Sequence, residues 1–387
     1  MPGPEPRSLF SPPSPVAELG DSERLASLRL IRSENVGPVT FRDLIGHFGS
    51  AEAALAAMPE LSRRGGFKRA IRLCTPDEAE AELDRAGEAG AELLFMTEAR
   101  YPAALAALDA PPPLIYAKGR LPLLNRPTVA VVGSRQCSAA GAKLARHFAV
   151  ELGRAGYVIA SGLARGIDSV AHVAALDHGT VAVLAGGIDV VYPPEHQALQ
   201  AMVGERGCLL TEMPVGFVPR GKDFPRRNRI ISGVSLGVLI VEAARRSGTL
   251  VTARLAAEQG REVFAVPGHP LDPRAEGTNK LLKSGATLVT DASDLLSALT
   301  PLTAPPAMHL RDELPVVRGP GPMPPELSDG DRSRVVEALG PVPVDVDTLV
   351  RGTGLAIRTV QIALIELALA GRIERHGNGL VSLAPAP

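Results

Sequence analysis

The spacing of hydrophobic residues divides the chain into segments of different kinds. From about residue 22 to residue 74, apolar positions recur every three or four residues, which predicts a small module made only of helices. From residue 128 to about residue 300, short apolar, β-branched runs alternate with stretches of helical spacing. The runs are TVAVV (128–132), YVIA (157–160), TVAVL (180–184), CLL (208–210), GVLIV (237–241), EVFAV (262–266) and TLVT (287–290). Apolar runs without polar alternation are typical of strands buried on both faces, so this region predicts an α/β fold.

The extent of the strand region and the positions of the proline-rich segments predict the domain boundaries. The strand region predicts an extended Rossmann-like, doubly wound, mostly parallel sheet over residues 96–300, with LIYAKG (114–119) added at its front. A helical domain precedes it over residues 21–95, and six prolines in residues 1–20 predict a disordered leader. Eight prolines in residues 301–328 predict a semi-rigid linker. Three helical stretches and a glycine-turn hairpin then predict a winged-helix-like domain over residues 329–387.

Both small domains carry patterns that are used for DNA binding elsewhere. LRLIRSENVGPVTFRDLIGHFGS resembles a helix-hairpin-helix, a motif that offers backbone amides to a phosphate, and the domain is of the SAM or helix-hairpin-helix kind. Its turn has Gly37 but lacks the second glycine, so a structural bundle and a DNA contact are equally supported. The recognition helix of the winged-helix-like domain has arginines only at its ends, Arg358 and Arg372. A protein–protein role is therefore favoured for it, because DNA affinity depends on neutralised phosphates.

Charge and cysteine usage narrow the class of protein. With 41 basic and 42 acidic residues the net charge is -1, so any nucleic-acid site must concentrate its positive charge locally. No apolar run is long enough for a membrane span and no signal peptide is evident, so we expect a cytoplasmic protein. Cys74, Cys137 and Cys208 are too widely spaced for a metal motif, and no metal is expected. Aromatic residues are only 3%, which disfavours an extended platform for stacking bases.

The residues that follow the apolar runs are rich in glycine. In an open α/β sheet, ligands bind outside the carboxyl ends of the strands. The first run ends in Gly133-Ser134-Arg135, the second leads into SGLARGID (161–168), and the third leads into GGID (186–189). Three such turns in one sheet predict an anion-binding edge. The fingerprints GxGxxG and GxxxxGK[ST] are absent, and no spacing unites a catalytic set, so neither a cofactor nor an enzyme activity is expected.

The densest positive charge lies in RGKDFPRRNR, residues 220–229. Five basic residues against Asp223 give a local balance of +4. Pro225 is expected to start a helix with arginines in its first turn, a position that the helix dipole disfavours and that a bound anion would relieve. A solvated basic loop is the alternative. Ser247, Gly248 and Thr249 predict a further helix start with hydroxyl groups that can cap the helix or bind phosphate.

The order of these motifs resembles one known family. VGSR, SGLARGID, AVLAGGIDVVYP, LLTEMP, FPRRNRIISG, VEAARRSGTLVTA and VFAVPGHP followed by GTNKLLKSGA resemble the family of DNA-processing protein A (DprA, or Smf) over about residues 128–290. The resemblance implies a protein without enzyme activity that binds and protects single-stranded DNA. It also implies loading of the RecA recombinase in natural transformation and homologous recombination, and homodimerisation through the Rossmann domain.

The motifs place the predicted DNA contacts in five loops. One departure from the family follows Tyr192-Pro193, where members often have a lysine and this chain has Pro194-Glu195, which weakens the expectation of a contact there. The predicted DNA-binding residues are Gly133, Ser134, Arg135, Ser161, Gly162, Arg165, Gly166, Gly186, Gly187, Lys222, Phe224, Arg227, Asn228, Arg229, Ser247, Gly248 and Thr249.

Two other classes of function remain as alternatives. The sheet also resembles nucleotide-processing hydrolases of the phosphoribohydrolase class, which use a PGGxGT motif, whereas this chain reads VEAARRSGT. A transcription regulator that reads DNA through the winged helix is less well supported, because the recognition helix is poor in basic residues.

Overall fold

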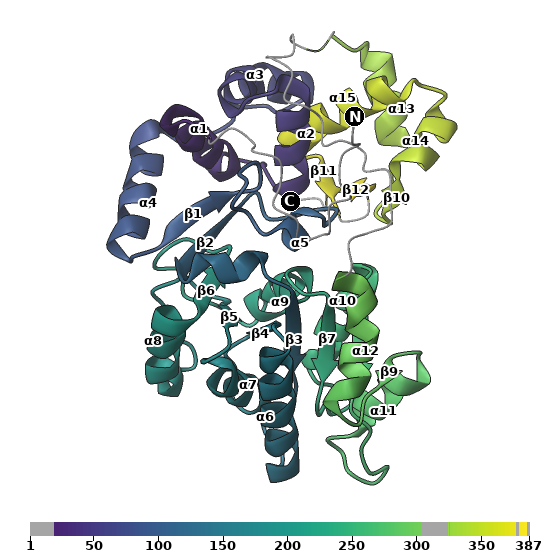
Figure 1. The fold of residues 1–387 in the computed structure, drawn as a ribbon. Coiled ribbons are helices and arrows are strands. Elements are labelled where there is room, and N and C mark those ends of the chain that lie inside the picture. The colour runs from purple at the N-terminus through teal and green to yellow at the C-terminus, as the bar shows by residue number, and fades with distance from the viewer. Residues whose placement is uncertain (1–18, 304–323, 325, 377–378, 385–387) are drawn as a thin grey trace, which may run out of the picture. The chain divides into compact units, whose positions relative to one another are not determined.

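The computed structural model describes residues 19–303, 324, 326–376 and 379–384 (Figure 1). Most of the predicted leader and most of the predicted linker lie outside these ranges. The described residues form two compact units. The first unit contains residues 84–108 and those described within 114–309, and the second contains the helical segment before residue 84, residues 109–113 and the C-terminal segment.

The first unit is built on a nine-stranded sheet in the order β1-β2-β6-β5-β4-β3-β7-β8-β9. The seven apolar runs and LIYAKG all form strands of this sheet, which confirms the predicted α/β, mostly parallel fold. All pairings from β6 to β9 are parallel, whereas β1 and β2 are antiparallel additions at one edge. The strands are β1 (Glu92–Phe95), β2 (Leu114–Gly119), β3 (Thr128–Val132), β4 (Val158–Ser161), β5 (Thr180–Val183), β6 (Cys208–Thr211), β7 (Gly237–Ile240), β8 (Glu262–Ala265) and β9 (Thr287–Leu288).

The strand β1 is a difference from the sequence-based expectation. The sequence pattern predicts residues 92–95 as part of the helical domain, but they pair with β2 at the edge of the sheet. The run ELLF is short and follows directly after a helix, so periodicity alone could not separate it from that helix. The part of the chain that forms the sheet therefore begins at Glu92.

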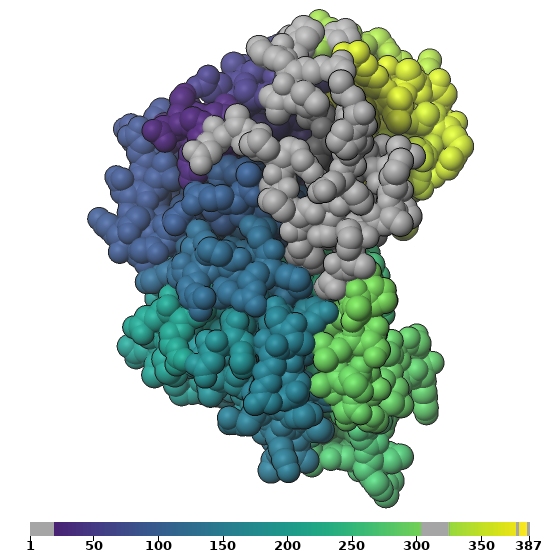
Figure 2. All heavy atoms as spheres, in the orientation of Figure 1, coloured from purple at the N-terminus to yellow at the C-terminus, as the bar shows by residue number. Residues whose placement is uncertain are grey.

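Helices cover both faces of the sheet (Figure 1). On one face Ala130 and Val132 of β3 pack with residues of α9 and α10, and on the other face Val129 and Val131 pack with α6, α7 and α12. Helices α6 and α12 contact each other and close over their face (Figure 2). The helices of this unit are α5 (Ala103–Ala106), α6 (Ala139–Arg154), α7 (Ile167–Ala175), α8 (Gln197–Arg206), α9 (Asp223–Gly233), α10 (Thr249–Glu258), α11 (Glu276–Lys283) and α12 (Ala292–Thr303), with short 3₁₀ helices η1 (Leu121–Asn125) and η2 (Pro194–His196).

The second unit combines helices from the two ends of the described chain. Its N-terminal part contains α1 (Asp21–Arg32), α2 (Pro38–Phe48), α3 (Ala51–Arg64) and the start of α4 (Pro76–Glu88). Its C-terminal part contains α13 (Asp329–Glu337), α14 (Val346–Thr353), α15 (Ile357–Leu369) and the small sheet of β10 (Val344–Asp345), β12 (Leu380–Leu383) and β11 (Ile373–Arg375). Three helices with a small antiparallel sheet confirm the predicted winged-helix domain.

Helix α15 packs against α3 within this unit. Its position is fixed at Gly65, where an added Cβ would lie only 2.0 Å from the carbonyl oxygen of Glu366. Two polar contacts support the packing: Asn35 Nδ2 donates to the Leu369 carbonyl at 2.9 Å, and Arg375 pairs with Asp43 at 2.7 Å. The helix in the recognition position is thus part of the core of this unit.

Within the described ranges, no single helix is long and apolar enough to cross a membrane. Helices α14 and α15 meet that criterion only as a pair, with a bend of 114° between them.

Candidate nucleic-acid interface

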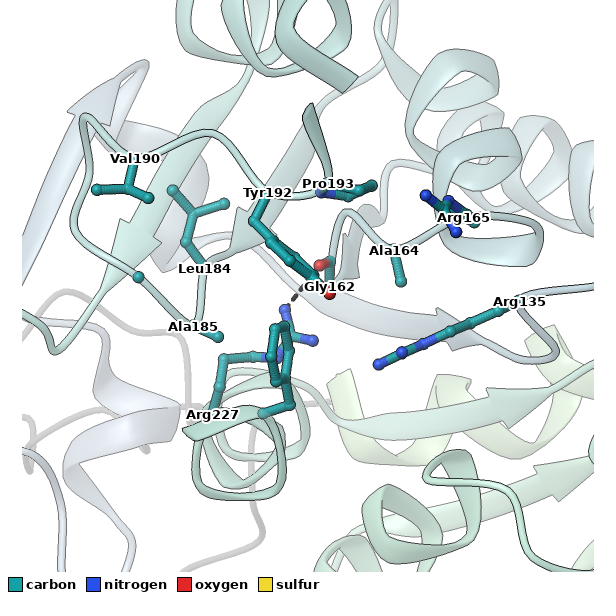
Figure 3. Close-up of a pocket in the computed structure, with 12 residues that line it drawn as sticks. Arg135, Gly162, Ala164, Arg165, Leu184, Ala185, Val190, Tyr192, Pro193 and Arg227 are labelled. Atoms are coloured by element: carbon teal, nitrogen blue, oxygen red, sulfur yellow. Dashed lines mark hydrogen bonds between the residues drawn. The ribbon is translucent and has the colours of Figure 1, made fainter. Parts of the chain in front are cut away.

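The loops at the carboxyl ends of β3, β4 and β5 meet the start of α9 around a pocket of about 50 Å³ (Figure 3). Six of the predicted DNA-binding residues line this pocket: Arg135, Gly162, Arg165, Gly186, Phe224 and Arg227. The other lining residues are Ala164, Leu184, Ala185, Val190, Tyr192 and Pro193.

Two glycines allow the loops to approach one another. Gly166 has a φ of +75°, and a Cβ there would lie 2.2 Å from the carbonyl oxygen of Ser134, so the loops after β3 and β4 can touch only with glycine at this position. A Cβ on Gly162 would lie 2.6 Å from the guanidinium of Arg227. The loop after β4 is further fixed by Asp168, whose carboxylate accepts from the amide of Gly162 at 3.2 Å and that of Ala164 at 3.4 Å.

Arg227 is a buried scaffold residue at the floor of the pocket. Its side chain is 7% exposed, and its guanidinium donates to the carbonyl oxygens of Gly162 and Val183, the former at 2.7 Å (Figure 3). Burial lowers the pKa of Arg227 to about 10, opposed by the charge of Asp168. Burial likewise raises the pKa of Asp168, opposed by Arg227 and the two amides. The two charges therefore stabilise each other beneath the pocket.

Arg135 is an exposed arginine that points into the pocket (Figure 3). Its guanidinium carbon lies 5.7 Å from the ring centroid of Phe224, and the Phe224 ring lies 4.9 Å from that of Tyr192, which is 46% exposed. Across the described residues, no acidic side chain forms an ion pair with Arg135. A free cation beside an accessible aromatic pair can meet a phosphate and a base at the same time.

Two other arginines of the predicted basic cluster are paired with an acid. Arg226 and Arg229 both form ion pairs with Glu212, which lies after β6 and is 9% exposed. In addition, Asp223 lies in the first turn of α9 and accepts the amide of Arg220. The expectation of an uncompensated helix start was therefore wrong: α9 begins at Asp223 rather than at Pro225, and an acidic group already faces the dipole.

Eleven predicted residues do not line the pocket. Ser161 is fully buried and its hydroxyl donates to the Val131 carbonyl at 2.7 Å, so it supports the loop from beneath. Thr249 Oγ1 donates to the Gly133 carbonyl at 3.0 Å, and Asn228 donates to the Gly248 carbonyl at 3.4 Å. The full set outside the lining is Gly133, Ser134, Ser161, Gly166, Gly187, Lys222, Asn228, Arg229, Ser247, Gly248 and Thr249.

Tyr192 is the main lining residue that the sequence reasoning missed. The lack of a lysine weakens the expectation of a contact after Tyr192-Pro193, yet Tyr192 and Pro193 both line the pocket. The motif GGIDVVYP itself carried the signal, since an aromatic residue within a few positions of a glycine-rich strand end can reach the ligand edge.

The N-terminus of α6, where a nucleotide phosphate binds in many Rossmann-like sheets, is occupied by a carboxylate. Glu242 accepts the Ser138 amide at 3.0 Å and the Ser138 hydroxyl at 2.5 Å. A Cβ on Gly141 would lie 2.6 Å from the same carboxylate. Glu242 is thus committed to capping α6, and a phosphate at this position would face its negative charge.

Three amides on the N-terminal side of the hairpin in the N-terminal domain donate within the chain. The amide of Glu34 donates to the Arg72 carbonyl at 2.9 Å, that of Ser33 to Leu30 at 3.2 Å and that of Val36 to Ser33 at 3.4 Å. Helix α2 begins after Gly37 with no side-chain cap, so both interpretations of this motif remain open. Helix α15 has a structural role in the winged helix, because Val360 and the run from Ile362 to Leu369 are buried.

Three family descriptions match this chain. Residues 92–300 match "DNA recombination-mediator protein A", residues 21–85 match "DprA-like N-terminal HHH domain", and residues 319–379 match "DprA winged helix domain". Protein Smf of Escherichia coli is 41% identical over 295 residues, which cover 74% of this chain and 76% of the relative. DNA processing protein DprA of Streptococcus pneumoniae is 46% identical over 199 residues, covering 51% of this chain and 70% of the relative.

Solved structures support the same assignment. The structure of DprA from Streptococcus pneumoniae is similar with a TM-score of 0.53 at 40% identity, covering 58% of this chain and 82% of that chain. DNA processing protein A from Helicobacter pylori, described for its single-stranded DNA binding mode, is similar with a TM-score of 0.50 at 30% identity, covering 55% and 96%. With its three domains matched in order and its pocket motifs in place, the chain belongs to the DNA recombination-mediator protein A family, known as DprA or Smf.

Proposed function

We propose that this protein binds single-stranded DNA at the carboxyl edge of the sheet without reading its sequence. The observation that carries the proposal is Arg135, an exposed guanidinium next to the Tyr192 and Phe224 rings that has no acidic partner among the residues the structure describes. A phosphate on Arg135 and a base on the aromatic pair would suit a single strand, whose bases are free to stack. The Helicobacter pylori relative, described as a single-stranded DNA binder, supports the same ligand.

The finer steps of the function rest on this binding. The bound strand would be protected and passed to the RecA recombinase in natural transformation and homologous recombination, within the cytoplasm.

We also propose a homodimer formed through the Rossmann domain. The exposed edge strand β9, with Leu288 52% exposed, supports it, because unpaired strand edges readily pair with another chain. Light scattering of a Leu288→Asp variant should show a shift toward monomer, and an unchanged mass would exclude this edge.

We propose that the protein has no enzyme activity. The alternative function is nucleotide hydrolysis. Glu242, the acid that follows β7, caps α6 rather than facing an open site, which favours the binding role. The two functions separate in one pair of assays. Oligonucleotide binding is measured by fluorescence anisotropy, and release of ribose 5-phosphate is measured from nucleoside monophosphates.

The direct test of the proposal compares labelled oligo(dT), a mixed-sequence strand and the matching duplex. The single strands should bind with similar affinities, because phosphate contacts and stacking carry little base information, and the duplex should bind more weakly. RecA loading is then measured as strand exchange on a strand coated with single-strand-binding protein. Tighter binding of the duplex, or sugar release without strand binding, would overturn the proposal.

A further inference from the structure

An ion pair at the rim of the pocket sets Arg165 apart from Arg135. Arg165 follows β4 and lines the pocket, and its guanidinium bonds to the carboxylate of Glu195 in η2. Both side chains are open to solvent, with 62% and 46% of their surfaces exposed. The pair therefore lies where a strand entering the pocket would meet it.

The backbones that carry this pair are joined to each other. His196, next to Glu195, donates from Nδ1 to the carbonyl oxygen of Leu163 at 2.9 Å. On the other loop the amide of Ala164 bonds to Asp168 at 3.4 Å, which fixes the position from which Arg165 extends. Because both loops are anchored beside the pair, forming it costs less side-chain and backbone entropy than an ordinary surface ion pair.

We propose that the ion pair with Glu195 prevents Arg165 from contacting a phosphate of the bound strand, so that Glu195 limits the affinity of the pocket for single-stranded DNA. This inference rests on the proposed function of the same site. In the bound state Arg135 meets a phosphate, whereas Arg165 stays on Glu195 and neutralises none. The carboxylate also adds a negative charge near the path of the phosphates.

The charge states at neutral pH agree with this role. The hydrogen bond from Arg165 lowers the pKa of Glu195, and the same bond raises the pKa of Arg165. Both groups are therefore charged at neutral pH. Arg135 has no such acidic partner among the residues that the structure describes, so the two pocket arginines are expected to respond to DNA differently.

The experiment is a double-mutant cycle on the full-length protein with oligo(dT) as the probe. Glu195→Gln frees Arg165 and should raise affinity at low salt about two- to fivefold, the range expected when one exposed charge pair is changed. The slope of log affinity against log salt should become steeper by about 0.7, because one more phosphate is neutralised. Adding Arg165→Gln to Glu195→Gln should remove both gains, whereas Arg165→Gln alone should leave the slope unchanged.

A matched control separates this effect from net charge. Glu151 pairs with Arg154 near the far end of α6, and Glu151→Gln removes the same charge without freeing a pocket arginine. Affinity equal to that of wild type is expected for this control. An unchanged affinity in Glu195→Gln, a matching gain in the control, or a loss of slope in Arg165→Gln alone would each overturn the proposal. If wild type does not bind oligo(dT) at all, it is the proposed function that fails.

Discussion

The pocket edge of the first unit and the end domains of the second unit contain the same kinds of groups but use them differently. Both have glycine turns, helix starts and arginines. At the pocket, Arg135 and the rings beside it remain accessible, while in the second unit three hairpin amides bond to carbonyl oxygens of the chain and α15 is buried against α3. The comparison teaches that a DNA-binding pattern indicates a site only when its donors are left unsatisfied by the fold.

The largest expected effect is a difference in stability between substitution of Arg227, the buried scaffold arginine, and substitution of Arg135, the accessible arginine. Arg227→Ala would leave buried Asp168 without the opposing charge and the Gly162 and Val183 carbonyls without their donor, which should lower the free energy of unfolding of the first unit by about 3–5 kcal/mol. Urea unfolding of the full chain measures this, with hydrogen exchange in β3–β5 to locate the loss. Arg135→Ala is the control and should unfold like wild type. Equal stability of the two variants would mean that Arg227 is not a scaffold residue.

Acid should affect the first unit through His172, which is buried and bonded to Thr180. Burial lowers the pKa of His172 from 6.5 to about 3, so the unfolded chain takes up this proton first. The contribution of neutral His172 to the stability of the first unit is therefore fully present above about pH 6.5. It is lost as the pH falls toward 3, which should lower the free energy of unfolding by up to a few kcal/mol. The stability of wild type relative to His172→Asn should decrease over this window. A constant difference between the two proteins would contradict the assignment.

The packing of the second unit can be broken without touching the pocket. Gly65→Ala places a Cβ 2.0 Å from the Glu366 carbonyl and should lower the stability of this unit by about 1–3 kcal/mol. Gly46→Ala is the matched control, since nothing lies within 4 Å of its Cβ. Hydrogen exchange in α3 and α15 reports the loss. Affinity for oligo(dT) should not change, and a clear drop would place part of the DNA surface in the second unit.

The smallest expected effect is that of removing metals and nucleotides. The described residues contain no cluster of three potential metal ligands, and the sequence lacks a Walker loop. Binding of oligo(dT) should therefore be equal with and without EDTA and should need no ATP. Loss of binding on chelation, restored by a divalent cation, would show that the phosphate contacts are not made by arginine alone.

Most of the fold could be predicted from the sequence, because each central strand is an apolar run between glycine-rich turns. The edge strand β1 could not, since ELLF fits a helix end as well as a strand. For the candidate site, loops that were named from the sequence meet around one pocket, but the roles of their residues could not be predicted. The local balance of +4 overstated the free charge, because Glu212 and Asp168 come from other segments and meet the arginines only in the folded chain.

The direct test of the central claim is a salt titration of oligo(dT) binding by Arg135→Ala, with Arg154→Ala as a distant control and melting curves for both. If Arg135 is the accessible phosphate contact, its removal should weaken binding to every sequence alike and flatten the slope of log affinity against log salt by about 0.7. The control should match wild type, and both variants should melt like wild type. A slope in Arg135→Ala equal to that of wild type would contradict the account.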